Sequence, residues 1–69
     1  MNHTASLTSR ERAIVGLVGE GLSYEEIGHR LRVGTTAVKN HVRAIFGKLG
    51  FRTRLEIVAY ARRNGSGGL

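Results

Sequence analysis

A helix-start pattern that occurs three times constrains the fold of this chain more than any other feature. In each copy a serine or threonine is followed three positions later by a glutamate. The hydroxyl can accept the third helical N–H, while the glutamate reaches back to the N–H of the capping residue. The three pairs are Thr8 and Glu11, Ser23 and Glu26, and Thr53 and Glu56. Helical periodicity follows each pair, so the sequence predicts helices and no strands.

Glycines follow the expected helices where a left-handed cap is needed. Gly21 comes after the first helix, Gly50 after the third and Asn64-Gly65 after the fourth. The second helix is expected to end near Arg32, with Val33-Gly34 as the turn. Four helices are therefore predicted, at about residues 9–20, 24–32, 35–49 and 54–63. The expected fold is a compact all-α domain of four helices.

Some glycines fall inside the predicted helices, where each costs up to about 1 kcal/mol relative to alanine. Gly28 lies beside Ile27, and we interpret it as a point where the next helix approaches closely. The sequence offers no reason for Gly16, Gly19 or Gly47.

The length of 69 residues allows one small domain. Residues 1–6 are interpreted as a disordered leader, residues 7–64 as the domain and residues 65–69 as a flexible tail. The absence of cysteine excludes a disulfide framework and a thiolate zinc site, and the three histidines lack the close spacing of helical ligands. We expect no metal, no cofactor, no membrane span and no enzymatic activity.

The net charge of +6 is concentrated in one part of the chain. Between Glu26 and Glu56 lie seven lysines or arginines and no acid, whereas residues 1–28 hold four acidic and two basic side chains. Localised positive charge of this kind suits an anionic partner such as DNA.

The third predicted helix has two distinct faces. An apolar stripe with core-facing spacing comprises Val38, Val42, Ile45, Phe46 and Leu49. The opposite face carries no acid and comprises Thr36, Lys39, Asn40, Arg43 and Gly47. Arginine and lysine suit guanine edges and asparagine suits adenine, although a plain solvated surface is the alternative.

A short helix, a tight turn and a longer basic helix form a helix-turn-helix pattern. In such motifs the second helix enters the major groove and its N-terminal residues reach the bases. The predicted base contacts are Thr36, Lys39, Asn40 and Arg43.

Five segments in order along residues 7–65 resemble the LuxR/GerE-type DNA-binding domain of bacterial transcription regulators. They are Leu7–Arg12, Glu20–Gly28, Ala37–Val42, Ile45–Gly50 and Arg52–Glu56. The resemblance implies that the third helix reads the major groove, with Lys39, Asn40 and Arg43 facing bases, and that the fourth commonly mediates dimerisation. Three positions depart from the family pattern: Gly34 replaces serine, Ala37 replaces threonine and Gly28 replaces alanine.

The residues expected at the phosphate backbone are Thr35, His41, Lys48, Arg52 and Arg54. Thr35 or Thr36 could substitute for the threonine hydroxyl that is absent at Ala37. For His41 the alternative is a packed structural histidine that borders the core. For Arg54 the alternative is an internal ion pair at the start of a helix.

Apolar residues extend most of the way around the fourth predicted helix. Ile57, Tyr60 and Ala61 can face the core. A second stripe, predicted as a two-fold dimer interface, comprises Leu55, Val58, Ala59 and Arg62. The alternative is that one of these stripes is simply a wide edge of the core.

These features together predict a cytoplasmic, nucleoid-associated module that binds double-stranded DNA as a homodimer. Contact with RNA polymerase is a further expectation. One alternative is a sigma-factor-like, promoter-reading module that acts with the polymerase; another is a cationic protein-interaction or membrane-surface helical domain. The operator, activation versus repression, and whether the chain stands alone or ends a longer regulator stay open.

Overall fold

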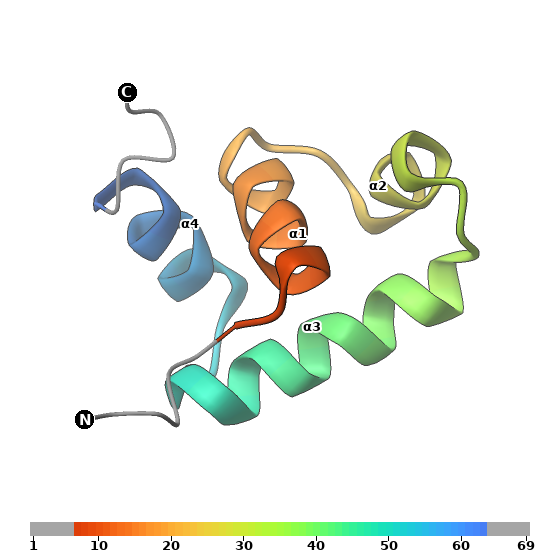
Figure 1. Ribbon diagram of the computed structural model, residues 1–69. Helices are drawn as coiled ribbons and strands as arrows, with labels where there is room; N and C mark the ends of the chain where they lie inside the picture. The colour runs from red at the N-terminus through yellow and green to blue at the C-terminus, as the bar shows by residue number, and fades with distance from the viewer. Residues whose placement is uncertain (1–6, 64–69) are drawn as a thin grey trace.

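The computed structural model describes residues 7–63 as four α-helices joined by short loops (Figure 1). The helices are α1 (Ser9–Gly19), α2 (Tyr24–Leu31), α3 (Thr35–Leu49) and α4 (Arg54–Arg63). No strand occurs in this part of the chain. The predicted all-α, four-helix architecture is confirmed. The leader, the tail and the cap expected at Asn64-Gly65 lie outside the described residues.

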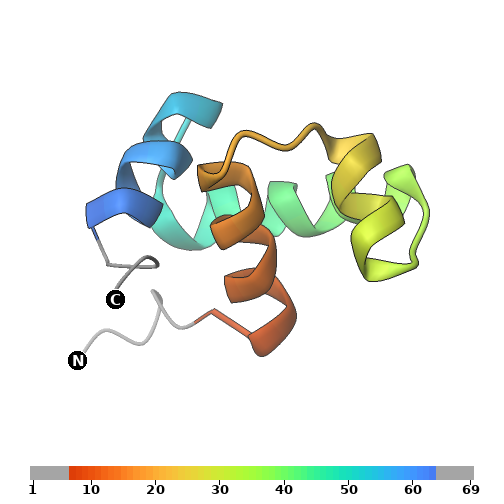
Figure 2. The same ribbon diagram turned by 90° about the horizontal axis from the view of Figure 1, so that it is seen from above.

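The first helix lies at the centre of the domain. Figures 1 and 2 both show α1 between α4 and α2, and α1 packs against all three other helices. The helix α2 packs on α3, which is the longest of the four. The buried apolar side chains are Leu7, Ile14, Val15, Val18, Ile27, Val38, Val42, Ile45, Ile57 and Ala61. Every helix therefore contributes to one core.

All three predicted helix starts form reciprocal hydrogen bonds. The Glu11 N–H donates to Thr8 Oγ1 at 3.0 Å, and the Thr8 N–H donates to the Glu11 carboxylate at 2.9 Å. The corresponding distances are 3.1 and 2.8 Å for Ser23 and Glu26, and 3.3 and 3.0 Å for Thr53 and Glu56. These local pairs explain why the helices begin where the sequence predicts.

The two helices before the turn each end one residue earlier than predicted. At α1 the cap is Glu20, and Gly21 then adopts a φ of +95°. At α2 the cap is Arg32, a non-glycine residue with a left-handed φ of +62°. The Val33 N–H closes the end of α2 by donating to the Gly28 carbonyl at 2.9 Å. The left-handed cap expected at Gly50 is present, with a φ of +72°.

Two helical glycines mark points of close approach. A Cβ at Gly28 would lie 2.7 Å from the carbonyl oxygen of Val33. Close packing at Gly28 is thus confirmed, and its partner is the turn that leads into α3. A Cβ at Gly19 would lie 2.6 Å from the Cβ of Ala61. Gly19, which had no assigned role, therefore lets α4 pack tightly on α1.

Substitution of Gly19 by alanine is expected to lower the free energy of unfolding by about 1–3 kcal/mol, because the new methyl group would overlap Ala61. Gly16→Ala in the same helix is the matched control. No atom from elsewhere in the fold lies within 4 Å of a Cβ at Gly16, so alanine there should stabilise by up to about 1 kcal/mol. Urea denaturation measures both changes. Equal stabilisation by the two substitutions would contradict the close contact of α1 with α4.

Candidate nucleic-acid interface

The helix-turn-helix unit consists of α2, the turn at residues 32–34 and α3. Gly34 occupies the N-cap of α3 with extended backbone, and no side chain accepts a hydrogen bond from the first turn. The start of α3 also carries no acidic residue. No acidic side chain of α3 itself therefore opposes the partial positive charge of its N-terminus, which favours an anion there, although Glu25 of α2 lines the same hollow as Gly34 and Thr35.

The face of α3 opposite the core is exposed and free of acids. Val38, Val42 and Ile45 are buried on the inner side. The four residues predicted to contact bases are all exposed: Thr36, Lys39, Asn40 and Arg43. We call these four residues the α3 outer face. The structure brings them together on one side of a single helix, as a groove-reading surface requires.

The five residues predicted at the phosphate backbone are found in two different settings. Thr35 and His41 are half-buried on α3, and Arg52 is exposed in the loop before α4. Lys48 and Arg54 instead make contacts within the protein. The structure thus separates residues available to a partner from residues with an internal role.

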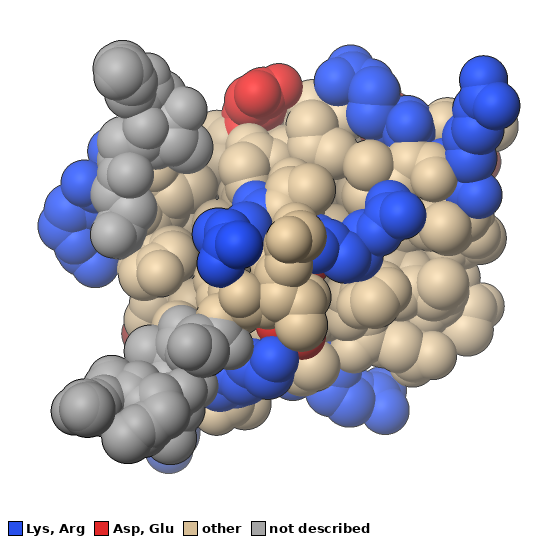
Figure 3. Space-filling model, viewed as in Figure 1, with Lys and Arg blue, Asp and Glu red and all other residues tan. Residues whose placement is uncertain are grey.

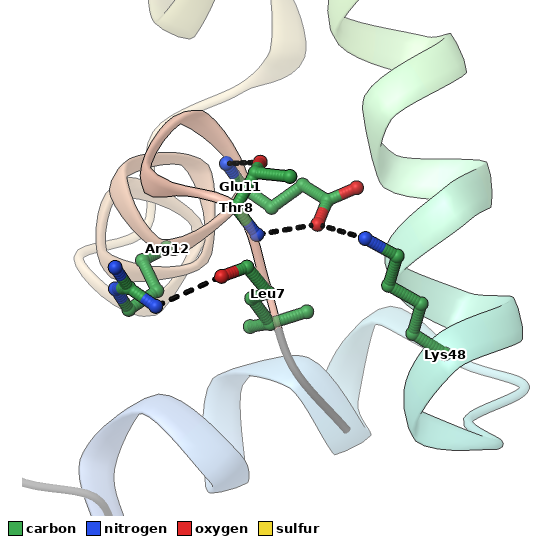
Figure 4. Close-up of polar contacts among 5 residues, drawn as sticks. All are labelled: Leu7, Thr8, Glu11, Arg12 and Lys48. Atoms are coloured by element: carbon green, nitrogen blue, oxygen red, sulfur yellow. Dashed lines mark hydrogen bonds and ion pairs between the residues drawn. The ribbon is translucent and has the colours of Figure 1, made fainter. Parts of the chain in front are cut away.

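Lys48 forms an ion pair with Glu11 that joins α3 to the start of α1 (Figure 4). The Lys48 Nζ lies 2.7 Å from Glu11 Oε1, the same oxygen that accepts the Thr8 N–H. Glu11 is only 4% exposed, so this is the buried charged residue of the described chain. The hydrogen bond from Lys48, followed by that from the Thr8 N–H, lowers the pKa of Glu11 below its ordinary value. The pairing of Lys48 with Glu11 was not foreseen from the sequence.

Arg54 contacts the start of the helix-turn-helix. Its guanidinium donates a hydrogen bond to the carbonyl of Leu22, and its Cζ lies 5.0 Å from the centroid of the Tyr24 ring. No ion pair involves Arg54 among residues 7–63. The internal ion pair considered for Arg54 is therefore wrong, because a backbone carbonyl and an aromatic face take the place of a carboxylate.

The apolar residues of α4 divide between the core and the surface. Ile57 and Ala61 are buried, and the Tyr60 ring packs edge-on against Phe51 with centroids 5.8 Å apart. On the predicted dimer stripe Leu55 is 77% exposed and Ala59 and Arg62 are also exposed, whereas Val58 packs partly against the core. Leu55 is the large hydrophobic residue that the described structure leaves most open to solvent.

On the face shown in Figure 3, basic side chains cover more of the surface than acidic ones. Lys and Arg side chains occupy several areas of the face in Figure 3, while acidic side chains show only in small areas.

Within residues 7–63, no three His, Asp or Glu side chains come together as a metal site would require. In the same region no helix is both long and apolar enough to cross a bilayer.

The short α2, the tight turn and the longer basic α3 define this domain as a helix-turn-helix protein. The chain belongs to the luxR family of bacterial regulatory proteins, whose GerE family model matches residues 5–61. It is 44% identical over 61 residues to a protein of Mycobacterium bovis named as an HTH-type transcriptional regulator, and 40% identical over 60 residues to the HTH-type transcriptional regulator MalT of Vibrio cholerae. These alignments cover 88% and 87% of this chain but 7% of each relative.

Proposed function

We propose that this domain binds double-stranded DNA sequence-specifically as part of a bacterial transcription regulator, with α3 in the major groove. The observation that carries the proposal is the α3 outer face, which exposes Lys39, Asn40 and Arg43 opposite the buried stripe. Asparagine can pair with adenine through two hydrogen bonds, and lysine or arginine can donate to guanine. Membership of the luxR family supports this role. A cytoplasmic, nucleoid-associated location and contact with RNA polymerase belong to the same proposal.

The phosphate contacts that we propose are Thr35, His41 and Arg52 together with the N-terminus of α3. Thr35 and His41 are half-buried on α3, and Arg52 is exposed. Each phosphate neutralised by a cation should contribute about −0.9 to the slope of log affinity against log salt. Lys48 is left out of this set because its ammonium pairs with Glu11.

Selection of bound sequences from random DNA tests the proposal. A preferred sequence should emerge, and the domain should bind it roughly a thousandfold or more tightly than unrelated DNA at physiological salt. Recovery of unenriched sequences, with equal affinity for all DNA, would contradict sequence-specific recognition.

We further propose that two copies meet through the stripe of α4 centred on Leu55. Replacing Leu55 by aspartate should weaken binding to a site with two half-sites by at least about tenfold, because burial of one leucine is worth about 1.5–3 kcal/mol. Binding to a single half-site is the control and should not change. The free energy of unfolding should shift by less than about 0.5 kcal/mol, since Leu55 is 77% exposed. An unchanged affinity of Leu55→Asp for the site with two half-sites would contradict the interface.

A further inference from the structure

Arg54 joins two parts of the domain whose backbones do not otherwise meet. Among the described residues, the Cα atoms of α4 come within 8 Å of those of α1 but of neither α2 nor α3. Arg54 is the first residue of α4, and its guanidinium reaches the Leu22 carbonyl and the Tyr24 ring. Leu22 lies immediately before the N-cap Ser23, and Tyr24 begins α2. The Arg54 side chain therefore makes a polar link between α4 and the start of the helix-turn-helix.

The two contacts of Arg54 can hold the start of α2 in a fixed orientation relative to α4. A hydrogen bond from a charged guanidinium is shorter and stronger than one between neutral groups. The planar guanidinium can also lie over an aromatic ring while its N–H groups donate elsewhere. Because Arg54 is half-buried, both contacts are partly shielded from water. The pair of contacts constrains the direction as well as the position of the start of α2.

The position of α2 is transmitted to α3 through the turn. The Val33 N–H donates to the Gly28 carbonyl, and a Cβ at Gly28 would lie 2.7 Å from the Val33 carbonyl oxygen. The turn thus lies directly on α2, and α2 packs on α3. A change at the start of α2 therefore alters where the α3 outer face stands relative to the rest of the domain.

We propose that Arg54 is a positioning residue, which holds the helix-turn-helix in a fixed orientation against α4 and does not contact phosphate. The inference rests on the proposed DNA-binding function. Arg52, two residues earlier, is exposed, and no salt bridge involves it among residues 7–63. Arg52 is the matched control, because its loss removes the same charge from the same segment without removing the link to α2.

The test compares Arg54→Met with Arg52→Met. Affinities for the selected sequence and for unrelated DNA are measured at several salt concentrations, at a temperature where each variant is fully folded. Arg54→Met should weaken binding to the selected sequence about tenfold more than binding to unrelated DNA, a typical coupling between sites, and leave the salt slope unchanged. Arg52→Met should weaken binding to both DNAs and reduce the salt slope by about 0.9.

Two results would overturn the positioning role. A drop of about 0.9 in the salt slope for Arg54→Met, with equal loss on both DNAs, would make Arg54 a phosphate contact. Unchanged affinity of the folded Arg54→Met variant for the selected sequence would show that the link does not affect recognition.

A measurement without DNA separates failure of the link from failure of the proposed function. Arg54→Met removes both contacts and Tyr24→Leu removes the ring contact, so their effects on the free energy of unfolding should not add in full. Fully additive effects would overturn the contact between Arg54 and α2. If the parent chain prefers no DNA sequence, the proposed function and the positioning role both fail, while non-additive unfolding energies would still show that Arg54 joins α4 to α2.

Discussion

Replacement of Asn40 by alanine is expected to lower the affinity of the domain for its preferred DNA sequence by about 1–3 kcal/mol, the value of one lost base contact. Binding to unrelated DNA should be almost unchanged, because the amide carries no charge. Asn40 is exposed on the α3 outer face. The substitution should therefore leave the fold intact, and circular dichroism can confirm this. Titration of labelled duplexes measures both affinities.

Lys39→Ala should lower affinity for the preferred sequence by a similar amount, about 1–3 kcal/mol. Its matched control is Arg10→Ala, which removes the same charge from an exposed position on α1. The control should affect the preferred and unrelated sequences equally, through long-range charge alone. If Asn40→Ala and Lys39→Ala also weakened binding equally on both DNAs, the α3 outer face would supply affinity without specificity.

A large loss of stability is also expected from removing the charge of Glu11. Glu11→Gln should lower the free energy of unfolding by about 1–3 kcal/mol, because the ion pair with Lys48 is replaced by a weaker contact with a neutral amide at a buried site. A core in a chain of this size supplies only about 3–5 kcal/mol, so the variant should melt much earlier. Glu20→Gln, at an exposed position after the same helix, is the control and should change stability by less than about 0.5 kcal/mol.

The same residue should make stability depend on pH in the acid range. The pKa of Glu11 is lowered in the folded state, so its contribution is complete above its ordinary pKa of 4.5 and is lost as the pH falls through the lower, folded-state pKa. Hydrogen bonds from the Ser23 N–H lower the pKa of Glu26, and those from Arg52 and Thr53 lower the pKa of Glu56. The parent chain should therefore lose stability on acidification.

Urea unfolding between about pH 3 and 5 measures the slope of the free energy of unfolding against pH. Glu11→Gln should flatten it in part, because Glu26 and Glu56 still titrate. A slope as steep in Glu11→Gln as in the parent chain would show that the ion pair with Lys48 does not lower the pKa of Glu11.

Local chemistry made the helix boundaries predictable. The starts of α1, α2 and α4 depend on hydrogen bonds between residues three apart, as between Ser23 and Glu26, and these are visible in the sequence. The apolar spacing of α3 likewise predicts which side is buried, because the helical repeat alone sets it. The end of α2 was displaced because Arg32 takes a left-handed conformation that its residue type does not favour.

The roles of several cations could not be predicted in the same way. Lys48 and Arg54 lie in basic segments that resemble a DNA-binding surface. The sequence predicted phosphate contacts for both, with an internal ion pair as the alternative for Arg54. Their partners are 37 and 32 residues away along the chain, at Glu11 and Leu22. Only a structure that shows which segments meet can separate a cation with an internal partner from one that is available to DNA.

By itself, then, the sequence determined the four helices, their starts, the inward stripe of α3 and the family, because each depends on residues close together along the chain. The tertiary structure decided the rest. It showed that Gly19 admits α4, that Lys48 pairs with Glu11, and that Arg54 reaches α2. Those contacts join distant segments, and the energy of such a contact exists only once the helices have packed.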